Sequence, residues 1–450
     1  MTYNDTVFAL STPVGGAIAI MRISGPEARR ALQTVFTGRI EPRRVSYGTL
    51  TDVDGSAIDS VCAVFFEAPA SYTGEDMAEI YCHGSRAVAA RLAERLASLG
   101  FMRPAEAGEF TKRAYLWGKM DLVRAEAVMD LISASAERSR KAALSQLEGR
   151  LSSITESLYQ RVKEILAELA NYLEDDTGEA VFDASRAAAD ADAAASEAGT
   201  LAESGMRSRI LREGARVAII GSPNVGKSSL LNALLLRERA IVTPVPGTTR
   251  DTLEESLSID GIPIVLVDTA GIRETPDAVE SEGVARSRRE AADADLVLWT
   301  VDGTRELSDG DLEILGSISG KRTIAVLTKA DLARSLTPEA DGTFRSFPAV
   351  RTSAVTGEGM TALKSLVAES LLPGAFEGEE DIVTNTRHIT ALKSASAALS
   401  DAKEALYAWN FDAAFFSLRE AMDSLAGILG KDDPGEELVD SIFAGFCIGK

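Results

Sequence analysis

Short apolar runs and longer helical patterns alternate in blocks along the chain. Up to about residue 118, runs rich in Val, Ile and Phe, such as 17–23 and 61–66, are separated by Gly and Pro and predict strands. Residues 85–99 carry apolar positions at helical spacing and are followed by Gly100, which is typical of a helix C-terminus. This part of the sequence predicts a small α+β domain.

The next block is helical in style. From Asp121 to about Arg212 the sequence is rich in Ala, Leu, Glu, Ser and Arg and contains no Pro, which predicts several helices. Its Ala-dense piece, 184–198, has few large apolar side chains and predicts a surface helix or a weakly packed one. Residues 385–430 return to the same style. The simplest interpretation is one helical domain interrupted by an insertion, and two independent helical segments are the alternative.

Strands and helices alternate inside the insertion. A helix is predicted at 227–236, and Asp260-Gly261 predicts a hairpin. The predicted strands are 216–220, 256–259, 264–268, 296–301, 323–327 and 347–352. This alternation predicts an α/β domain with a mostly parallel sheet covered by helices on both faces. The predicted domains are therefore 1–118 (α+β), 119–213 (helical, first part), 214–373 (α/β) and 374–450 (helical, second part).

Composition narrows the class of protein. The chain has 450 residues, 45% of them hydrophobic, and a net charge of −21, which argues against coating nucleic acid by general electrostatics. Three scattered cysteines (Cys62, Cys82, Cys447) do not form a disulfide framework. The N-terminus lacks the basic start of a signal peptide, and no apolar run approaches the roughly 18 residues of a spanning helix. We expect a cytoplasmic protein that does not enter a membrane.

A phosphate-binding loop is the clearest motif. The predicted strand 216–220 leads into Gly-Ser-Pro-Asn-Val-Gly-Lys-Ser at 221–228, which matches G-x-x-x-x-G-K-[ST]. Glycines let the backbone N–H groups point at phosphate oxygens, and the following helix N-terminus adds partial positive charge. We expect Lys227 to reach the β- and γ-phosphates and the Ser228 hydroxyl to bind Mg²⁺. A purely structural glycine-rich turn is the alternative.

Two further motifs resemble the switches of GTPases. Asp268-Thr269-Ala270-Gly271 ends an apolar strand, where an Asp can hold the hydration shell of Mg²⁺ and a Gly N–H can meet the γ-phosphate. Pro-Gly-Thr-Thr-Arg-Asp at 246–251 offers Thr249 as the second hydroxyl ligand of Mg²⁺.

Two more motifs indicate guanine as the base. Thr328-Lys329-Ala330-Asp331 resembles Asn-Lys-x-Asp, whose Asp accepts two hydrogen bonds that adenine cannot offer. Thr stands where Asn is usual, so we expect weaker support of this loop. Ser353-Ala354-Val355 resembles the last guanine-loop motif. The five motifs stand in GTPase order and predict a Ras-like GTP-binding domain.

The usual catalytic groups for hydrolysis are missing from these motifs. Ras-type proteins place a Gln after Asp-x-x-Gly to orient water, whereas this chain has Ile272. No arginine finger in the same chain is evident. Asn224 offers a polar oxygen near the α- and β-phosphates, where a monovalent cation can bind.

The whole chain resembles the tRNA-modification GTPases of the MnmE family, also called TrmE. The resemblance rests on the phosphate loop and its continuation Ser-Leu-Leu-Asn, the 246–251 switch, the inserted position of the GTPase domain and the terminal Cys-Ile-Gly-Lys at 447–450. Four N-terminal stretches add to it: 20–25, 72–76, 113–116 and 119–122.

The resemblance implies a specific chemistry. MnmE proteins form homodimers and work with a flavin-bearing partner, MnmG (GidA), in a heterotetramer. Together they add an aminomethyl or carboxymethylaminomethyl group to C5 of the wobble uridine of certain tRNAs, with a carbon from a reduced folate such as 5-formyl-tetrahydrofolate. The family's folate contacts fall on Arg22, Glu79, Lys119 and Lys450. A carboxylate suits the amidine-like edge of a pterin, and cations suit the glutamate tail.

The resemblance also implies a potassium-activated mechanism. The family's potassium ligands map to Asn224, Thr243, Val245 and Thr248, and its water-positioning acid maps to Glu280. Potassium would then stabilise charge between the β- and γ-phosphates in place of an arginine finger. Glu280 and Lys227 are the predicted catalytic residues. The full set of predicted nucleotide contacts is Asn224, Val225, Gly226, Lys227, Ser228, Ser229, Thr243, Pro244, Val245, Pro246, Gly247, Thr248, Thr249, Asp268, Thr269, Ala270, Gly271, Thr328, Lys329, Asp331, Ser353, Ala354 and Val355.

Three alternatives stay open at this point. Cys447 is either a nucleophile or a small thiol in a tail motif, since neither His83 nor His388 is near it in sequence. A ribosome-assembly GTPase would share the phosphate loop but would have no use for the N-terminal residues or the Cys-Ile-Gly-Lys tail. A scaffold or membrane-remodelling GTPase would need an apolar or amphipathic membrane segment, and none is evident.

Overall fold

The chain divides into two compact units. The computed structural model describes residues 4–175, 177, 179–238, 255–267, 291, 294–333, 342–373, 383–431 and 435–450. One unit comprises Met1–Met129, Ser152–Gln160 and Met422–Lys450, and the other comprises Asp130–Leu151 and Arg161–Ala421. None of the described helices is long and apolar enough to cross a bilayer.

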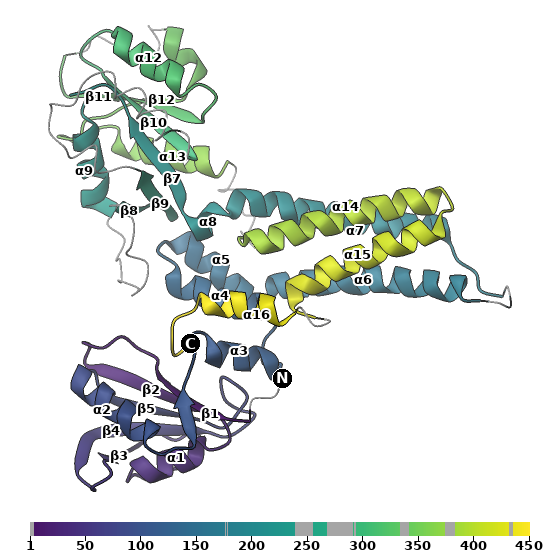
Figure 1. The fold of residues 1–450 in the computed structure, drawn as a ribbon. Helices are drawn as coiled ribbons and strands as arrows, with labels where there is room; N and C mark the ends of the chain where they lie inside the picture. The colour runs from purple at the N-terminus through teal and green to yellow at the C-terminus, as the bar shows by residue number, and fades with distance from the viewer. Residues whose placement is uncertain are drawn as a thin grey trace. The chain divides into compact units, whose positions relative to one another are not determined.

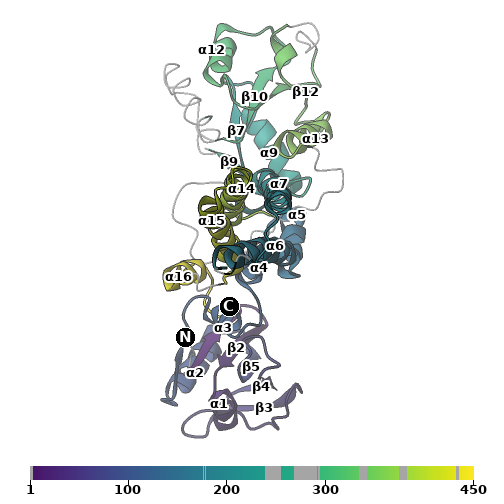
Figure 2. The same cartoon turned by 90° about the vertical axis from the view of Figure 1, so that its right-hand side faces the viewer.

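The first unit is built on a six-stranded sheet with the order β3-β4-β5-β2-β1-β6, in which β1 and β6 pair in parallel and the other neighbours are antiparallel. Its elements are β1 (Thr6–Leu10), β2 (Ile18–Ser24), α1 (Ala28–Val35), β3 (Ser46–Thr51), β4 (Ala57–Phe66), β5 (Met77–His83), α2 (Arg86–Ala97), β6 (Met102–Pro104), α3 (Glu109–Leu116) and α16 (Glu436–Ala444). Helices α1 and α2 lie on one face of the sheet (Figure 2). Their side chains, such as Leu32 and Leu92, are buried in one core with Ile80 of β5. The expectation of an N-terminal α+β domain is confirmed.

Both ends of the chain contribute to this unit. Phe443 of α16 is buried together with Leu122 and Ala125, and the Tyr115 hydroxyl of α3 donates to the Gly430 carbonyl at 2.7 Å. Three helices, α4 (Leu122–Ser133), α6 (Arg150–Leu173) and α15 (Phe411–Leu429), contribute residues to both units.

A buried arginine connects β1 and α3 to residues 67–76, the segment between β4 and β5. The Arg113 side chain is 0% exposed and bonds to the carboxylates of Asp5 (2.8 Å), Glu75 (3.2 Å) and Glu109 (2.8 Å). Arg103 forms a two-pronged ion pair with Glu109 at 2.7 and 2.9 Å. Burial by itself would raise the pKa of Glu109, but the hydrogen bonds from Arg103 and Arg113 outweigh it and hold that pKa below its ordinary value of 4.5.

The second unit contains the α/β sheet, with the order β12-β11-β10-β7-β9-β8, in which β8 alone among these six strands is antiparallel to its neighbour. Its elements are β7 (Ala215–Ile220), α9 (Lys227–Glu238), β8 (Glu255–Ile259), β9 (Ile262–Val267), β10 (Leu296–Asp302), α12 (Asp309–Ser317), β11 (Thr323–Thr328), the 3₁₀ turn η1 (Gly342–Ser346), β12 (Ala349–Arg351) and α13 (Met360–Leu371).

Separate cores cover the two faces of this sheet. On one face Leu231 of α9 and Leu363 of α13 are buried against the strands, and on the other Ile314 of α12 packs with Trp299. The turn residues Asp260 and Gly261 have φ of 47° and 80°, as a tight hairpin turn requires. The predicted fold, a mostly parallel sheet with helices on both faces, is confirmed.

Helices from before and after the inserted α/β segment pack on one another, together with the short helices α5 (Glu137–Leu147) and α8 (Ile210–Glu213) of this unit. α7 (Ala184–Ser208) and α14 (Thr386–Tyr407) run side by side along their lengths (Figure 1, Figure 2). The prediction for 184–198 is confirmed in part. The helix exposes one face, which includes Ala189 and Ala193, but the other face is not weakly packed, because Ala187, Ala191 and Ala198 are buried. Small side chains let the two backbones approach closely, and the Ser396 hydroxyl of α14 donates to the Ala195 carbonyl at 2.8 Å.

Replacing Arg113 by Met should destabilise the first unit by about 3–5 kcal/mol, since it leaves Glu75 buried without a cation and removes one of the two arginines that pair with Glu109. In the wild type, the lowered pKa of Glu109 adds to the free energy of unfolding above pH 4.5. This contribution is lost as the pH falls below 4.5 and the carboxylate protonates in the folded protein. Hydrogen exchange of β1 and α3 measures both effects. Arg44→Met, which removes an exposed pair with Glu41, is the matched control and should change stability by less than about 1 kcal/mol. Equal effects of the two variants would contradict the assignment.

Candidate functional site

The phosphate loop lies where β7 ends and α9 begins. A Cβ at Gly221 would meet the Thr300 carbonyl oxygen at 2.2 Å, and Gly226 has φ of 104°. Both positions therefore require glycine. Ser228 and Ser229 are exposed in the first turn of α9, where free backbone N–H groups and the helix dipole favour an anion.

Lys227 is folded back onto its own loop. Its Nζ donates to the carbonyls of Gly221 (2.7 Å) and Ser222 (2.8 Å). The Ser222 hydroxyl donates to Asp311 Oδ1 at 2.6 Å, and Asp311 also caps α12 through Ser308. Burial alone would raise the pKa of Asp311, but the hydrogen bonds from Ser222 and Ser308 hold it below its ordinary value. The loop is therefore anchored to the sheet on one side and to α12 on the other.

The two predicted guanine motifs follow neighbouring strands. The Thr328 hydroxyl, at the end of β11, contacts the carbonyl of Val225 in the phosphate loop and that of Val301. One hydroxyl proton is shared between two carbonyls, where an Asn amide would offer two donors, so the expected weaker support has a physical basis. Lys329 adopts φ of 59° and its Nζ pairs with Asp302 at 2.6 Å. Asp331 is exposed beyond it.

The loop after β12 is shaped by Ser353. The buried Ser353 Oγ accepts from the N–H groups of Val355 (3.2 Å) and Thr356 (3.1 Å). Ala354 lies in the same turn, and Val355 is 86% exposed. Because β7, β11 and β12 belong to the parallel part of the sheet, the three loops emerge at the same edge, where nucleotide sites of α/β folds lie.

The remaining predicted nucleotide and catalytic residues lie outside the described residues. They are Thr243, Pro244, Val245, Pro246, Gly247, Thr248, Thr249, Asp268, Thr269, Ala270, Gly271 and Glu280.

A second group of predicted residues meets on the sheet of the first unit. Arg22 of β2 and Glu79 of β5 are direct cross-strand partners, and Arg22 Nε donates to Glu79 Oε1 at 2.8 Å. The Tyr81 hydroxyl donates to Glu79 Oε2 at 2.7 Å, and the Arg22 guanidinium lies 5.4 Å from the centre of the Tyr72 ring. Glu79 is thus a mid-strand carboxylate with both oxygens held by neighbours.

The C-terminal tail brings Lys450 to this group. Ile448 forms a β-bridge with Ala107, and the Lys450 carbonyl accepts from the Phe110 N–H at 3.1 Å. Gly449 has φ of 94°, and a Cβ there would meet the Leu10 carbonyl oxygen at 2.3 Å. Burial, and then the nearby Arg22 cation, hold the pKa of the Lys450 ammonium below its ordinary value of 10.5.

Lys119 and Cys447 form hydrogen bonds with parts of the first unit other than the Arg22–Glu79 pair. The Lys119 ammonium donates to the Pro69 carbonyl at 3.0 Å, in the segment 67–76 that also carries Tyr72. The Cys447 carbonyl accepts from the Gly108 N–H at 3.4 Å, and its thiol is half-buried. His83 pairs with Asp59 at 2.8 Å on the sheet, so it has a structural partner of its own.

Sequence reasoning missed Tyr81 and Asp311. Tyr81 stands two residues after Glu79, and the period of two along a strand puts both on one face, so this signal was available. Asp311 is far from the phosphate loop in sequence, and only the packing of α12 brings it to Ser222.

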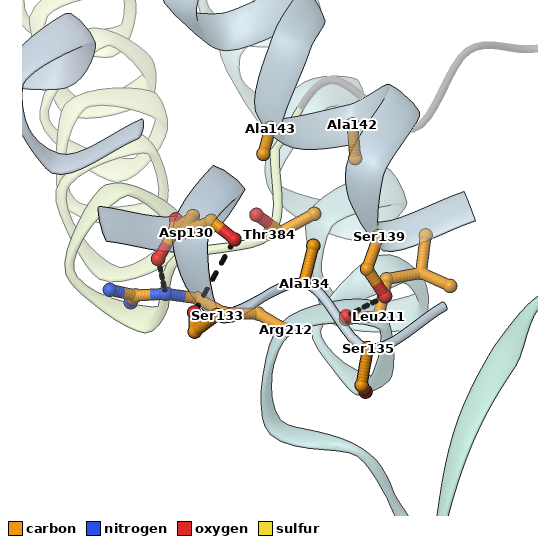
Figure 3. Close-up of a pocket in the computed structure, with 10 residues that line it drawn as sticks. All are labelled: Asp130, Ser133, Ala134, Ser135, Ser139, Ala142, Ala143, Leu211, Arg212 and Thr384. Carbon is orange, nitrogen blue, oxygen red and sulfur yellow. Dashed lines mark hydrogen bonds and ion pairs between the residues drawn. The ribbon is translucent and has the colours of Figure 1, made fainter. Parts of the chain in front are cut away.

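A small polar pocket lies elsewhere in the second unit (Figure 3). Its wall contains three hydrogen bonds: from Arg212 Nε to Asp130 Oδ1 at 2.7 Å, from the Ser133 hydroxyl to the Asp130 carbonyl at 3.3 Å, and from the Ser139 hydroxyl to the Leu211 carbonyl at 2.5 Å. None of the predicted site residues lines it.

Comparison with known proteins covers nearly the whole chain. The family described as "MnmE helical domain" matches residues 122–447, and the family described as "GTP-binding protein TrmE N-terminus" matches residues 6–119. The chain belongs to the MnmE family. One relative, the "tRNA modification GTPase MnmE" of Natranaerobius thermophilus, is 40% identical over 457 residues, covering 99% of each chain. The protein of the same name from Bacillus subtilis is 40% identical over 466 residues, covering 99% of this chain and 100% of its own.

Within this family assignment, the Thr328 hydroxyl should support GTP binding. Thr328→Val keeps the shape and removes the proton shared by Val225 and Val301, so GTP affinity should fall by about five- to tenfold, the worth of one neutral hydrogen bond. Thr328→Asn should bind at least as tightly as the wild type. Equilibrium titration with a fluorescent GTP analogue measures both.

Thr300→Val is the matched control, because this buried Thr of β10 bonds only within its own strand, at 3.3 Å to the Leu298 carbonyl. Its affinity should stay within about twofold of the wild type. A Thr328→Val protein that binds like the control would show that the hydroxyl does not hold the loop.

Proposed function

We propose that this chain is a potassium-activated GTPase that adds an aminomethyl or carboxymethylaminomethyl group to C5 of the wobble uridine of certain tRNAs, using a one-carbon unit from a reduced folate. The observation that carries the proposal is the seating of Lys450 beside the Arg22–Glu79 pair by the docked tail. A GTP-binding domain alone would fit many functions, whereas this second site needs both ends of the chain.

In the GTPase domain, the proposed roles follow the position of each residue. Lys227 exchanges its two loop carbonyls for β- and γ-phosphate oxygens when nucleotide is bound, which keeps its ammonium satisfied in both states. Ser228, exposed at the start of α9, and Thr249 would hold Mg²⁺, which neutralises phosphate charge when bound. Glu280 would orient the attacking water, which cleaves GTP to GDP and phosphate.

The potassium site is proposed at Asn224 and the switch residues Thr243, Val245 and Thr248. Asn224 adopts φ of 61° in the loop, a conformation that Asn tolerates better than most residues. A potassium ion would add to Lys227 the positive charge between the β- and γ-phosphates that an arginine finger supplies in other GTPases. Hydrolysis would then act as a conformational switch through pairing of two GTPase domains in a homodimer.

The folate site is proposed at Arg22, Glu79, Lys119 and Lys450. The Glu79 carboxylate accepts hydrogen bonds and suits the donor edge of a pterin, and the cations suit the carboxylates of the glutamate tail. The predominance of cations fits an anionic ligand. A part for the Cys447 thiol in the chemistry stays open, as does ammonium or glycine as the second substrate.

The proposed partners are a second copy of the chain, a flavin-dependent MnmG-type protein in a heterotetramer, and tRNA, which places the reaction in the cytoplasm. The proposed domains are those predicted from the sequence, 1–118, 119–213, 214–373 and 374–450. The alternative, a ribosome-assembly GTPase that binds rRNA, offers no reason for a basic residue seated by the tail on the N-terminal sheet.

Calorimetry with 5-formyl-tetrahydrofolate tests the second site. The full-length protein should bind it, and both removal of Lys450 and Glu79→Gln should weaken binding about tenfold or more, the loss expected for a charge-assisted hydrogen bond. Lys431→Gln is the control, since Lys431 lies in the same C-terminal segment but pairs with Glu156. Unchanged affinity after truncation would exclude Lys450 as a contact, whereas no binding by the full-length protein would favour the ribosome-assembly alternative.

GTP turnover in different salts tests the first site. At equal ionic strength, turnover should be at least about tenfold faster in potassium than in sodium, because a charge placed at the transition state is worth more than one hydrogen bond. Asn224→Ala should remove the difference and leave the slow rate. Equal rates of the wild-type protein in both salts would refute the potassium site.

A further inference from the structure

One end of the helical region carries a cluster of aromatic side chains. We call the two segments that form it, residues 172–184 and 404–416, the aromatic tip. The Phe411 ring lies 5.5 Å from that of Tyr172, 5.6 Å from that of Phe182 and 5.7 Å from that of Trp409. These contacts join the end of α6 and the start of α7 to the turn between α14 and α15, which meet at one end of the helices (Figure 1).

Large apolar side chains of the tip face solvent. Among the described residues of the tip, those with large exposed fractions are Leu173 (43%), Tyr407 (55%), Trp409 (70%), Phe416 (72%) and Val181 (95%). Trp409 is joined to the ring cluster through Phe411, and the other four residues lie on the same two segments. Scattered exposed apolar residues are normal, but five on two segments that pack together are typical of an interaction surface. Aromatic residues are also the side chains most often found at the centre of protein interfaces.

The backbone at Trp409 favours a binding role over a folding role. Trp409 follows directly on α14 with φ of 55°, a left-handed conformation that glycine adopts without strain. Of the three tryptophans in the chain, the one at this glycine-like position is the most exposed, since Trp117 is 49% and Trp299 0% exposed. Local folding would be better served by glycine, so the Trp side chain needs another reason.

The charge around the tip limits what can bind there. The two segments contain seven Asp or Glu residues and no Lys or Arg. Hydrogen bonds from Thr177 and from the Ala180 N–H lower the pKa of Asp175 to about 2, so this carboxylate is ionised at any physiological pH. Phosphates of RNA would be repelled, and a second copy pairing tip to tip would bring the same acids together.

We propose that the aromatic tip docks a partner protein that presents an apolar pocket rimmed by Lys and Arg. The pocket would take Trp409 and Phe416, and the cations on its rim would face Glu404 and Asp412 and stack on the aromatic rings. This site is separate from the nucleotide and folate sites and does not depend on the function proposed for them.

Photo-crosslinking in cells of the organism of origin identifies the occupant. The full-length chain carries p-benzoyl-phenylalanine in place of Phe416, and a second version carries it in place of Leu312 of α12, which is 46% exposed, as the control. Position 416 should cross-link to a protein that position 312 does not reach. Cross-links to RNA, to a second copy of this chain, or to nothing would each overturn the proposal.

The purified cross-linked protein is then titrated with full-length variants. Trp409→Gly and Asp412→Lys should each weaken binding about tenfold or more, and binding should weaken as salt rises. Trp409→Gly should leave the thermal midpoint close to that of the wild type, because relief of the left-handed backbone offsets the lost ring contact with Phe411, and this separates binding from folding. Leu312→Ser should bind like the wild type. Wild-type affinity of the Trp409→Gly protein would overturn the proposal.

Discussion

The contact of Gly449 with Leu10 is the constraint on which the arrangement of the first unit depends. The tail passes so close to β1 that a single methyl group would meet the Leu10 carbonyl at 2.3 Å. The bridge of Ile448 to Ala107 and the bond from Phe110 to Lys450 hold the tail in register. Because the last residues of the chain complete a surface made by its first residues, the chain must return to this unit after the second unit is built.

The helical region is interrupted by the inserted sheet. α7 precedes the inserted sheet and α14 follows it, yet the two pack along their lengths through small side chains. The inserted domain therefore leaves and rejoins one helical layer. Its nucleotide loop is attached to β11 through the Thr328 hydroxyl and to α12 through Ser222 and Asp311. Nucleotide binding in the loop can therefore affect both β11 and α12.

Buried charge is used in two ways in the first unit. Around Arg113, three carboxylates and two arginines satisfy one another and fix β1 and α3. Around Glu79, the carboxylate is held by one guanidinium and one phenol, and a half-buried ammonium stands nearby with a lowered pKa. The first arrangement pairs each carboxylate with an arginine, whereas the second places two cations beside one carboxylate, which is the feature on which the proposed folate site rests.

The local features of this protein were determined by its sequence alone. The phosphate loop, the Asp260-Gly261 turn, the strands of the α/β sheet, two strands of the N-terminal sheet and the order of the GTPase motifs could be predicted, because each depends on residues close together in the chain. Tertiary structure decided what distant residues do together. It buried the alanines of α7 by bringing α14 close, joined Asp311 to Ser222, and seated Lys450 beside Arg22. Sequence spacing carries no information on such meetings, since they depend on how whole elements pack.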